Sequence, residues 1–114
     1  FVEAARALMQ TLYGDPSGPA TASWPIELEA ADRESLLYNF LSEVLFLSEA
    51  ENLVFTGFDL TVTASPPSVT GWLRGRPFDP ARDAGGTEVK GISYSDLAIV
   101  ERDGEFCLEV LFDV

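Results

Sequence analysis

The sequence contains no histidine, and it has only one cysteine and one lysine. Without histidine, neither a Ser-His-Asp nor a Cys-His catalytic arrangement can form, and the ordinary zinc site is excluded as well. The single cysteine, Cys107, cannot form an internal disulfide, and its place in an apolar alternation predicts a small core residue. No apolar run is long enough to span a membrane.

Basic residues are scarce: 7 lysines and arginines stand against 19 acidic residues, which gives a formal net charge of -12. This balance argues against direct binding of nucleic acid, which needs cationic side chains to replace counterions, and against binding to an anionic membrane. It suits a hard cation or a basic protein partner. We expect no contact with nucleic acid or membrane.

The length of 114 residues, of which 46% are hydrophobic, predicts one globular domain over residues 1–114. The chain starts at Phe1, without an initiator methionine, and enters a helical pattern directly. We therefore expect that a natural N-terminal segment is missing ahead of Phe1.

Two stretches have helical spacing of apolar residues. The first covers residues 1–13 and ends at Gly14 and Pro16, and Asp32 has the character of an N-cap for the second. The second helix should pack on a sheet through a broad apolar stripe, although such a stripe also suits a ligand groove or a partner helix. The stripe consists of Leu36, Leu37, Phe40, Leu41, Val44, Leu45 and Leu47.

Alternation of apolar and polar residues predicts strands over 24–29, 58–63 and 69–76. Pro25 in the first of these favours the beginning of a strand or an edge position, because proline cannot donate a ladder hydrogen bond. In the last strand, the alternation places Arg74 and Arg76 on a solvent face.

The loop 77–86 contains two acidic residues, Asp79 and Asp83, whose carboxylates are candidate calcium ligands. The glycine and acid spacing of an EF-hand loop is absent, so ordinary turn chemistry is the better interpretation.

An Asp-Gly pair at 103–104 between two apolar runs predicts a C-terminal β-hairpin. Centred there, the register pairs Ile99 with Leu108 and, if continued without a bulge, Tyr94 with Asp113. A change of apolar phase makes a bulge near Ser95 the alternative. Together the elements predict an α+β fold with an antiparallel or mixed sheet, two helices packed on one face, and this hairpin.

Four segments, "ESLLYNFLSEVLFL", "GRPFDPARD", "TEVKGISYSDL" and the terminal "LFDV", occur in an order and at intervals that resemble the archease family. No single segment is specific, but the combination is, and the resemblance extends over the whole chain. It implies a non-enzymatic, cytoplasmic protein cofactor of the tRNA-splicing RNA ligase. That ligase joins RNA ends with GTP and manganese, and its cofactor promotes guanylylation of the ligase and repeated turnover.

The sequence departs from the family pattern in two places. Archeases begin with a His-Thr-Ala-Asp segment that this chain lacks, and Ser95 stands where the family usually has histidine. The first departure removes an aspartate that the resemblance assigns to a calcium site.

The chain end carries the remaining candidate metal ligands. Asp113 places a side-chain carboxylate beside the α-carboxylate of Val114, and calcium binds about six to eight oxygens. The resemblance implies that both groups bind calcium, in a site that is incomplete here. The structural alternative is a frayed, solvated terminus.

Lys90, Ser93 and Tyr94 are candidate contacts to the ligase or its nucleotide. Each also has a structural interpretation: a solvated lysine protecting a strand edge, a strand hydroxyl, and a half-buried aromatic. Two other functions stay open for the chain as a whole. One is an acidic chaperone-like interaction module, and the other is a carboxylate-based metal-dependent hydrolase.

Overall fold

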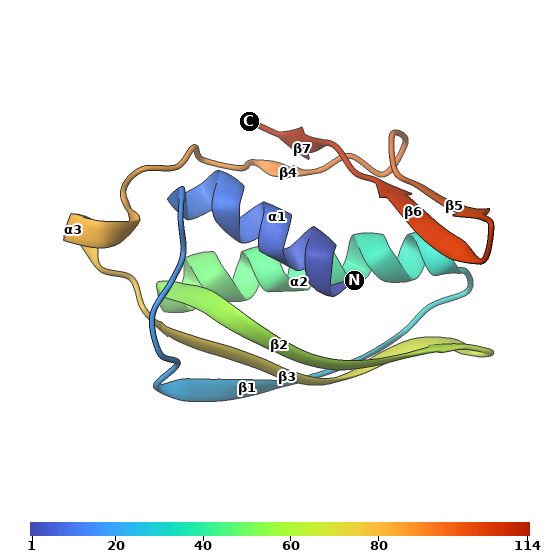
Figure 1. The fold of residues 1–114 in the computed structure, drawn as a ribbon, viewed down its shortest axis with the longest axis horizontal. Coiled ribbons are helices and arrows are strands. Elements are labelled where there is room, and N and C mark those ends of the chain that lie inside the picture. Colours follow the sequence, from blue (N-terminus) through green and yellow to red (C-terminus); the bar gives the residue numbers. More distant parts are fainter.

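Three layers stack in the computed structural model, which describes all residues 1–114. A three-stranded sheet forms one outer layer, two long helices form the middle, and the C-terminal strands form the other outer layer (Figure 1). This arrangement confirms the predicted α+β class. In chain order the elements are α1 (Val2–Tyr13), β1 (Ala22–Glu29), α2 (Arg33–Glu51), β2 (Leu53–Ala64), β3 (Pro67–Pro77), α3 (Pro80–Asp83), β4 (Gly91–Ile92), β5 (Ala98–Arg102), β6 (Glu105–Glu109) and β7 (Phe112–Asp113).

The three-stranded sheet is antiparallel, with the strand order β1-β3-β2. Strand β1 lies at an edge, which is one of the two positions that Pro25 favours. The register places Trp24, Leu73 and Phe58 in one row across the sheet, and this apolar face packs against the helices. The opposite face is polar, so the alternation in the sequence is the signal that orients the sheet.

Helix α2 begins and ends as local chemistry dictates. The Asp32 carboxylate accepts a hydrogen bond from the backbone N–H of Ser35 at 2.7 Å, which confirms the predicted N-cap and lowers the pKa of Asp32. The helix ends at Asn52, whose φ of 52° is left-handed. The buried face is the predicted stripe, except that Leu47 is only partly buried and Ser48 joins it.

Helix α1 lies beside α2 in the middle layer and buries Ala4, Ala5, Leu8 and Met9. It ends at Gly14, whose φ of 83° is the conformation that favours glycine. None of the helices is both long enough and apolar enough to cross a membrane.

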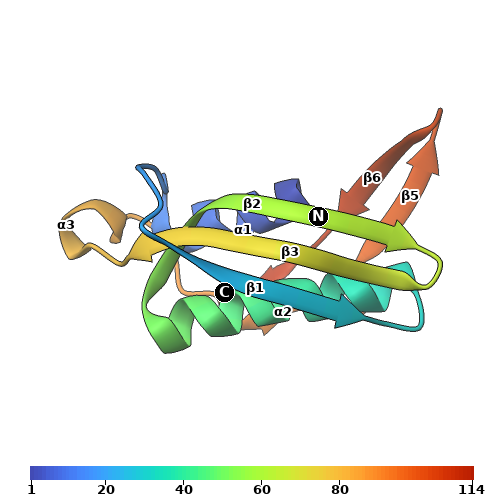
Figure 2. The ribbon, with the colours of Figure 1, turned by 90° about the horizontal axis from the view of Figure 1, so that it is seen from below.

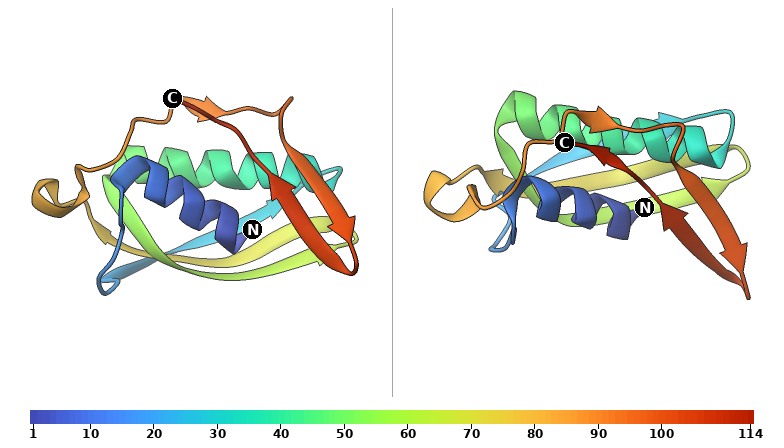
Figure 3. Two further views of the ribbon diagram at one scale, coloured as in Figure 1. Left: turned by 45° about the horizontal axis from the view of Figure 1, so that its top comes forward. Right: turned by 90° about the horizontal axis from the view of Figure 1, so that it is seen from above.

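The C-terminal strands do not extend the main sheet. Strands β4 and β7 form one antiparallel ladder and β5 and β6 form another, and both lie across the helices on the side away from the main sheet (Figure 3). The helices therefore pack on one face of the main sheet, as predicted, while their other side is covered by the end of the chain.

The hairpin turn is where the sequence placed it. Asp103 and Gly104 have φ values of 52° and 79°, and Ile99 lies opposite Leu108. The predicted pairing of Tyr94 with Asp113 is wrong, because Gly91 lies opposite Asp113 instead. Between β4 and β5 the chain forms a turn rather than the single bulge that the sequence suggested. The backbone N–H of Leu97 donates to Tyr94 O at 3.2 Å, and the residues of this turn leave the ladder.

The prediction that Cys107 is a core residue is wrong, because its side chain is exposed. Apolar alternation in β6 predicted burial, but the hairpin β5–β6 projects away from the body of the molecule and has no sheet packed on its outer side (Figure 2). The inward-facing residues Ile99 and Leu108 do pack against the core.

Leu41 tests the position of the core, because its side chain is fully buried in α2. Truncation to alanine removes buried methyl groups and leaves a cavity, so Leu41→Ala should lower the free energy of unfolding by about 2–5 kcal/mol. Denaturant titration measures this change. The control is Phe46→Ala in the same helix, at a side chain that is 62% exposed. Equal effects of the two changes would show that α2 buries a different face.

Candidate functional site

Most of the candidate residues meet at the ladder between β4 and β7. The backbone N–H of Lys90 donates to Asp113 O at 2.6 Å, and the backbone N–H of Ser93 donates to Leu111 O at 3.0 Å. We call residues 90–93 with 111–114 the C-terminal ladder. Its hydrogen bonds hold the backbone of Asp113 next to Lys90, while Val114 lies beyond the paired residues and is exposed.

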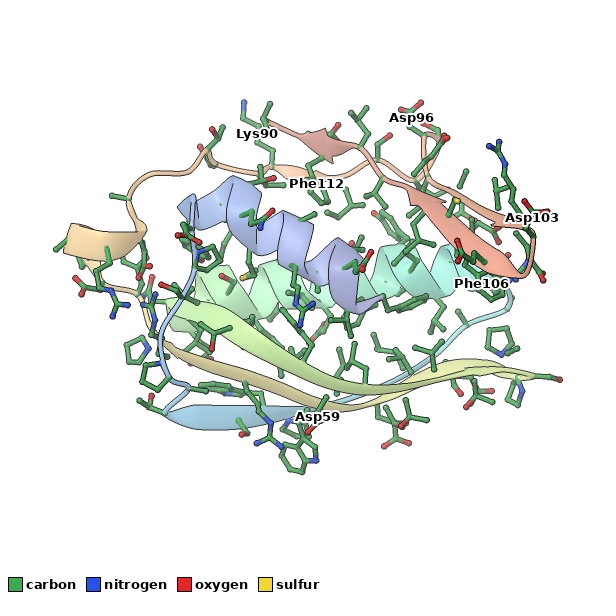
Figure 4. All side chains as sticks on the ribbon, viewed as in Figure 1. Asp59, Lys90, Asp96, Asp103, Phe106 and Phe112 are labelled. Carbon is green, nitrogen blue, oxygen red and sulfur yellow. The ribbon has the colours of Figure 1, made fainter.

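The Lys90 side chain is exposed, and it takes part in neither of the ion pairs in the structure. Figure 4 shows it pointing away from the helices, on the outer side of the C-terminal ladder. A flexible ammonium group in this position can reach an anionic group on a partner.

Tyr94 leaves the ladder and packs on α2. Its ring lies edge-on to that of Tyr38, with 5.4 Å between ring centroids, and its hydroxyl is 3.0 Å from Ser35 Oγ. Half of the Tyr94 side chain remains exposed. The hydroxyl of Ser93 donates to Asp96 Oδ2 at 2.8 Å, which ties the turn to the end of the ladder.

The residues at the chain end do not by themselves fit a calcium site. Asp113 and the α-carboxylate of Val114 supply anionic oxygens, whereas calcium takes about six to eight ligands. No group of three or more acidic or cysteine side chains gathers here or elsewhere in the structure. Calcium therefore remains a prediction from the resemblance.

A buried ion pair organises the loop that leads to Lys90. Two guanidinium nitrogens of Arg76 donate to the two carboxylate oxygens of Asp83, at 2.7 and 2.8 Å, and both side chains are buried. The expectation that Arg76 faces solvent is wrong. Alternation does place it on the outer side of the sheet with Arg74, but α3 and the segment around Ser17 cover that end, and Arg76 Nε donates to Ser17 O at 2.7 Å.

The acids of this loop are structural. Asp83 accepts from Arg76 and from the backbone N–H of Asp79, and Asp79 caps α3 by accepting from the N–H of Ala81. Hydrogen bonding to the guanidinium lowers the pKa of Asp83. The stability that the pair supplies is therefore present above the ordinary carboxyl pKa, and it is lost only as pH falls through the lowered value.

The loop is also fastened to its neighbours beyond the ion pair. The N–H of Phe78 donates to Asn52 O at 2.8 Å, and the N–H of Thr87 donates to Thr11 O at 2.7 Å. Gly86 lies so close to α1 that a Cβ there would stand 2.1 Å from Leu12 O. Val89, next to Lys90, is fully buried. These contacts fix the backbone from which Lys90 projects.

An apolar groove of about 910 Å³ runs between the start of α1, the end of β2 and the inner side of the hairpin β5–β6. Phe106 and Phe112 line it from the C-terminal strands, and Phe1 and Val62 line it from the body of the chain. The Arg33 guanidinium stacks over Phe106, 5.4 Å from the ring centroid. Most of its lining residues are hydrophobic, and the ionisable ones are Glu3, Arg33 and Cys107.

The Arg76–Asp83 pair is the structural support of the site that sequence reasoning missed. Its sequence signal is weak, since an arginine and an aspartate on either side of a turn-rich loop have many possible partners. The alternation of β3 correctly predicted the side of the sheet but carried no information on the loop that folds over it.

The model of the Archease protein family matches residues 1–114. The chain belongs to the archease family. The match confirms the resemblance seen in the sequence, and it covers the helices, the loop 77–86 and the C-terminal ladder alike.

Individual archeases show how far the similarity extends. The protein archease of Methanopyrus kandleri is 30% identical over 116 residues, which cover 100% of this chain and 83% of that protein. The archease of Pyrococcus furiosus is 39% identical over 93 residues, which cover 78% of this chain and 65% of its own length, less than two thirds. A crystal structure of an archease, described as a possible chaperone, from Thermotoga maritima has a TM-score of 0.60 at 18% identity. That alignment covers 98% of this chain and 79% of the other, so it supports the fold.

The buried ion pair generates a direct prediction. Arg76→Ala leaves the Asp83 carboxylate buried and uncompensated, so it should lower the free energy of unfolding by about 3–5 kcal/mol. The matched control is Arg74→Ala, because Arg74 lies in β3 like Arg76 but forms an exposed ion pair, with Asp59 of β2. Loss of this exposed pair should lower the free energy of unfolding by only about 0.2–1 kcal/mol. Denaturant titration of the two variants checks the difference. Equal losses would show that the loop does not depend on the buried pair.

Proposed function

We propose that this archease is a non-enzymatic, cytoplasmic protein cofactor that activates a tRNA-splicing RNA ligase. It promotes guanylylation of the ligase and allows repeated turnover. The observation that carries the proposal is the match to the archease family over residues 1–114, which includes the segments that form the C-terminal ladder. The ligase itself comes from what the resemblance implies about the family.

Charge supports a protein partner. The net charge of -12 suits docking on a basic surface, and a ligase that binds RNA must present basic surfaces. The cofactor has no need to hold RNA itself.

The C-terminal ladder is the proposed contact with the ligase near its nucleotide. Lys90 is the only lysine of the chain, it is exposed, and its backbone is held on both sides by Val89 and Asp113. An ammonium group placed in this way can neutralise charge on nucleotide phosphates. Tyr94 and Ser93 support the adjoining turn, and Tyr94 keeps half of its surface free for the partner.

A mixing assay separates this function from the two alternatives. The chain is incubated with the ligase of its own organism, GTP and manganese, and covalent guanylylation of the ligase is measured. Stimulation supports the cofactor. Hydrolysis of a phosphoester without ligase would instead indicate a metal-dependent hydrolase. Stable binding to other proteins, with neither activity, would indicate a chaperone-like module.

Lys90 provides the first prediction for this function. Loss of a charged contact costs about 1.5–3 kcal/mol, so Lys90→Ala should lower the stimulation of guanylylation roughly tenfold or more. The melting temperature should not change, because the side chain is exposed and unpaired. The control is Arg102→Ala, at an exposed basic residue in the hairpin. If Lys90→Ala stimulates guanylylation as strongly as the unmodified chain does, Lys90 does not contact the ligase or its nucleotide.

Calcium provides the second prediction. Since the residues present supply few anionic oxygens, the chain 1–114 should bind calcium weakly or not at all in titration calorimetry. If the unmodified chain gives a measurable heat of calcium binding, that heat should be smaller in Asp113→Asn. Tight calcium binding that survives this change would show that the chain end is not the metal site.

A further inference from the structure

The face of the three-stranded sheet that points away from the helices is a second surface of interest. On the central strand β3 it consists of Ser68, Thr70, Trp72 and Arg74, and we call these residues with their cross-strand partners the outer face. The partners of Trp72 are Pro25 and Asp59. Figure 4 shows Asp59 on the side of the sheet away from the helices.

Trp72 is the one large aromatic side chain on the outer face. Its side chain is 47% exposed, and the other outer-face positions are short, polar or charged apart from Pro25. Tryptophan is enriched at the energetic centres of protein interfaces, where an aromatic anchor is surrounded by a polar rim. The outer face has this composition, with Trp72 in its central strand.

The structure holds Trp72 in a fixed frame. Gly71 has a φ of 142°, and a Cβ at this position would stand 1.9 Å from Asp59 O, so only glycine allows the strands to approach so closely. Arg74 donates to Asp59 Oδ2 at 2.9 Å and to Ser23 Oγ at 3.3 Å. A surface that is rigid before binding loses little conformational entropy when a partner docks.

The charge of the outer face defines the chemistry of the partner. Glu27, Glu29 and Asp59 are exposed there, and the only cation, Arg74, is already paired with Asp59. The excess of negative charge favours lysine and arginine on the partner. An arginine or lysine can also stack on the face of an exposed indole.

We propose that the outer face is a second docking surface, separate from the C-terminal ladder, for a basic surface of the RNA ligase centred on Trp72. This inference rests on the proposed function, since it takes the same ligase as its partner. The two surfaces lie on opposite sides of the helix layer (Figure 1). The molecule measures 41 × 26 × 26 Å, so a ligase that contacts both surfaces must hold it within a cleft.

The test is the affinity of the ligase for variants of the chain, measured by titration calorimetry at two salt concentrations. Trp72→Ala should weaken binding roughly tenfold to a hundredfold, as loss of an interface anchor does. Trp72→Phe should weaken it less. The matched control is Phe46→Ala on α2, which removes another exposed aromatic side chain and should leave affinity unchanged. Glu27→Gln should reduce the dependence of affinity on salt.

The outcomes separate this inference from the proposed function. If Trp72→Ala binds the ligase as tightly as the unmodified chain does, while that chain stimulates guanylylation, only the second docking surface is wrong. If the unmodified chain neither binds nor stimulates the ligase, both proposals fail. Loss of binding to single-stranded RNA in Trp72→Ala, with ligase affinity unchanged, would assign the outer face to RNA and overturn the inference. Should Trp72→Ala lower the melting temperature, Trp72→Phe and Glu27→Gln decide the matter.

Discussion

Helix α2 is the element on which the rest of the structure depends, because its apolar surface must be covered on more than one side. Phe40, Leu41 and Val44 have no exposed surface. The helix contacts all three strands of the main sheet, α1, and the strands β4 and β5 of the C-terminal layer. Helix α1 shares the middle layer and also contacts β2. The position of the C-terminal ladder therefore follows from the burial of one helix.

Local features were predictable from the sequence, because each depends on neighbouring residues. The N-cap at Asp32 and the turn at Asp103 were placed correctly by short patterns. Features that depend on distant contacts were not. The alternation in β6 predicts a buried Cys107, but the hairpin β5–β6 projects from the body of the molecule and the side chain is exposed. The alternation in β3 predicts an exposed Arg76, but the loop that contains Asp83 folds over it and buries it. The pairing of Asp113 depended on a turn whose size the sequence did not specify.

The candidate site has the character of a contact surface rather than of a catalytic centre. Its lysine projects from a backbone fixed by the Arg76–Asp83 pair, by Val89 and by the ladder. The acids of the preceding loop are occupied with structural hydrogen bonds. What the chain offers to a partner is a rigid, acidic body with exposed Lys90 on the C-terminal ladder and exposed Trp72 on the outer face.

We propose above that this archease lets an RNA ligase work repeatedly. The most direct measurement is the number of RNA joints made by each ligase molecule, with excess RNA, GTP and manganese, in the presence and absence of the chain. We expect joining to continue well beyond one joint per ligase when the chain is present, and to stop near one joint when it is absent. Equal numbers of joints under the two conditions would contradict it.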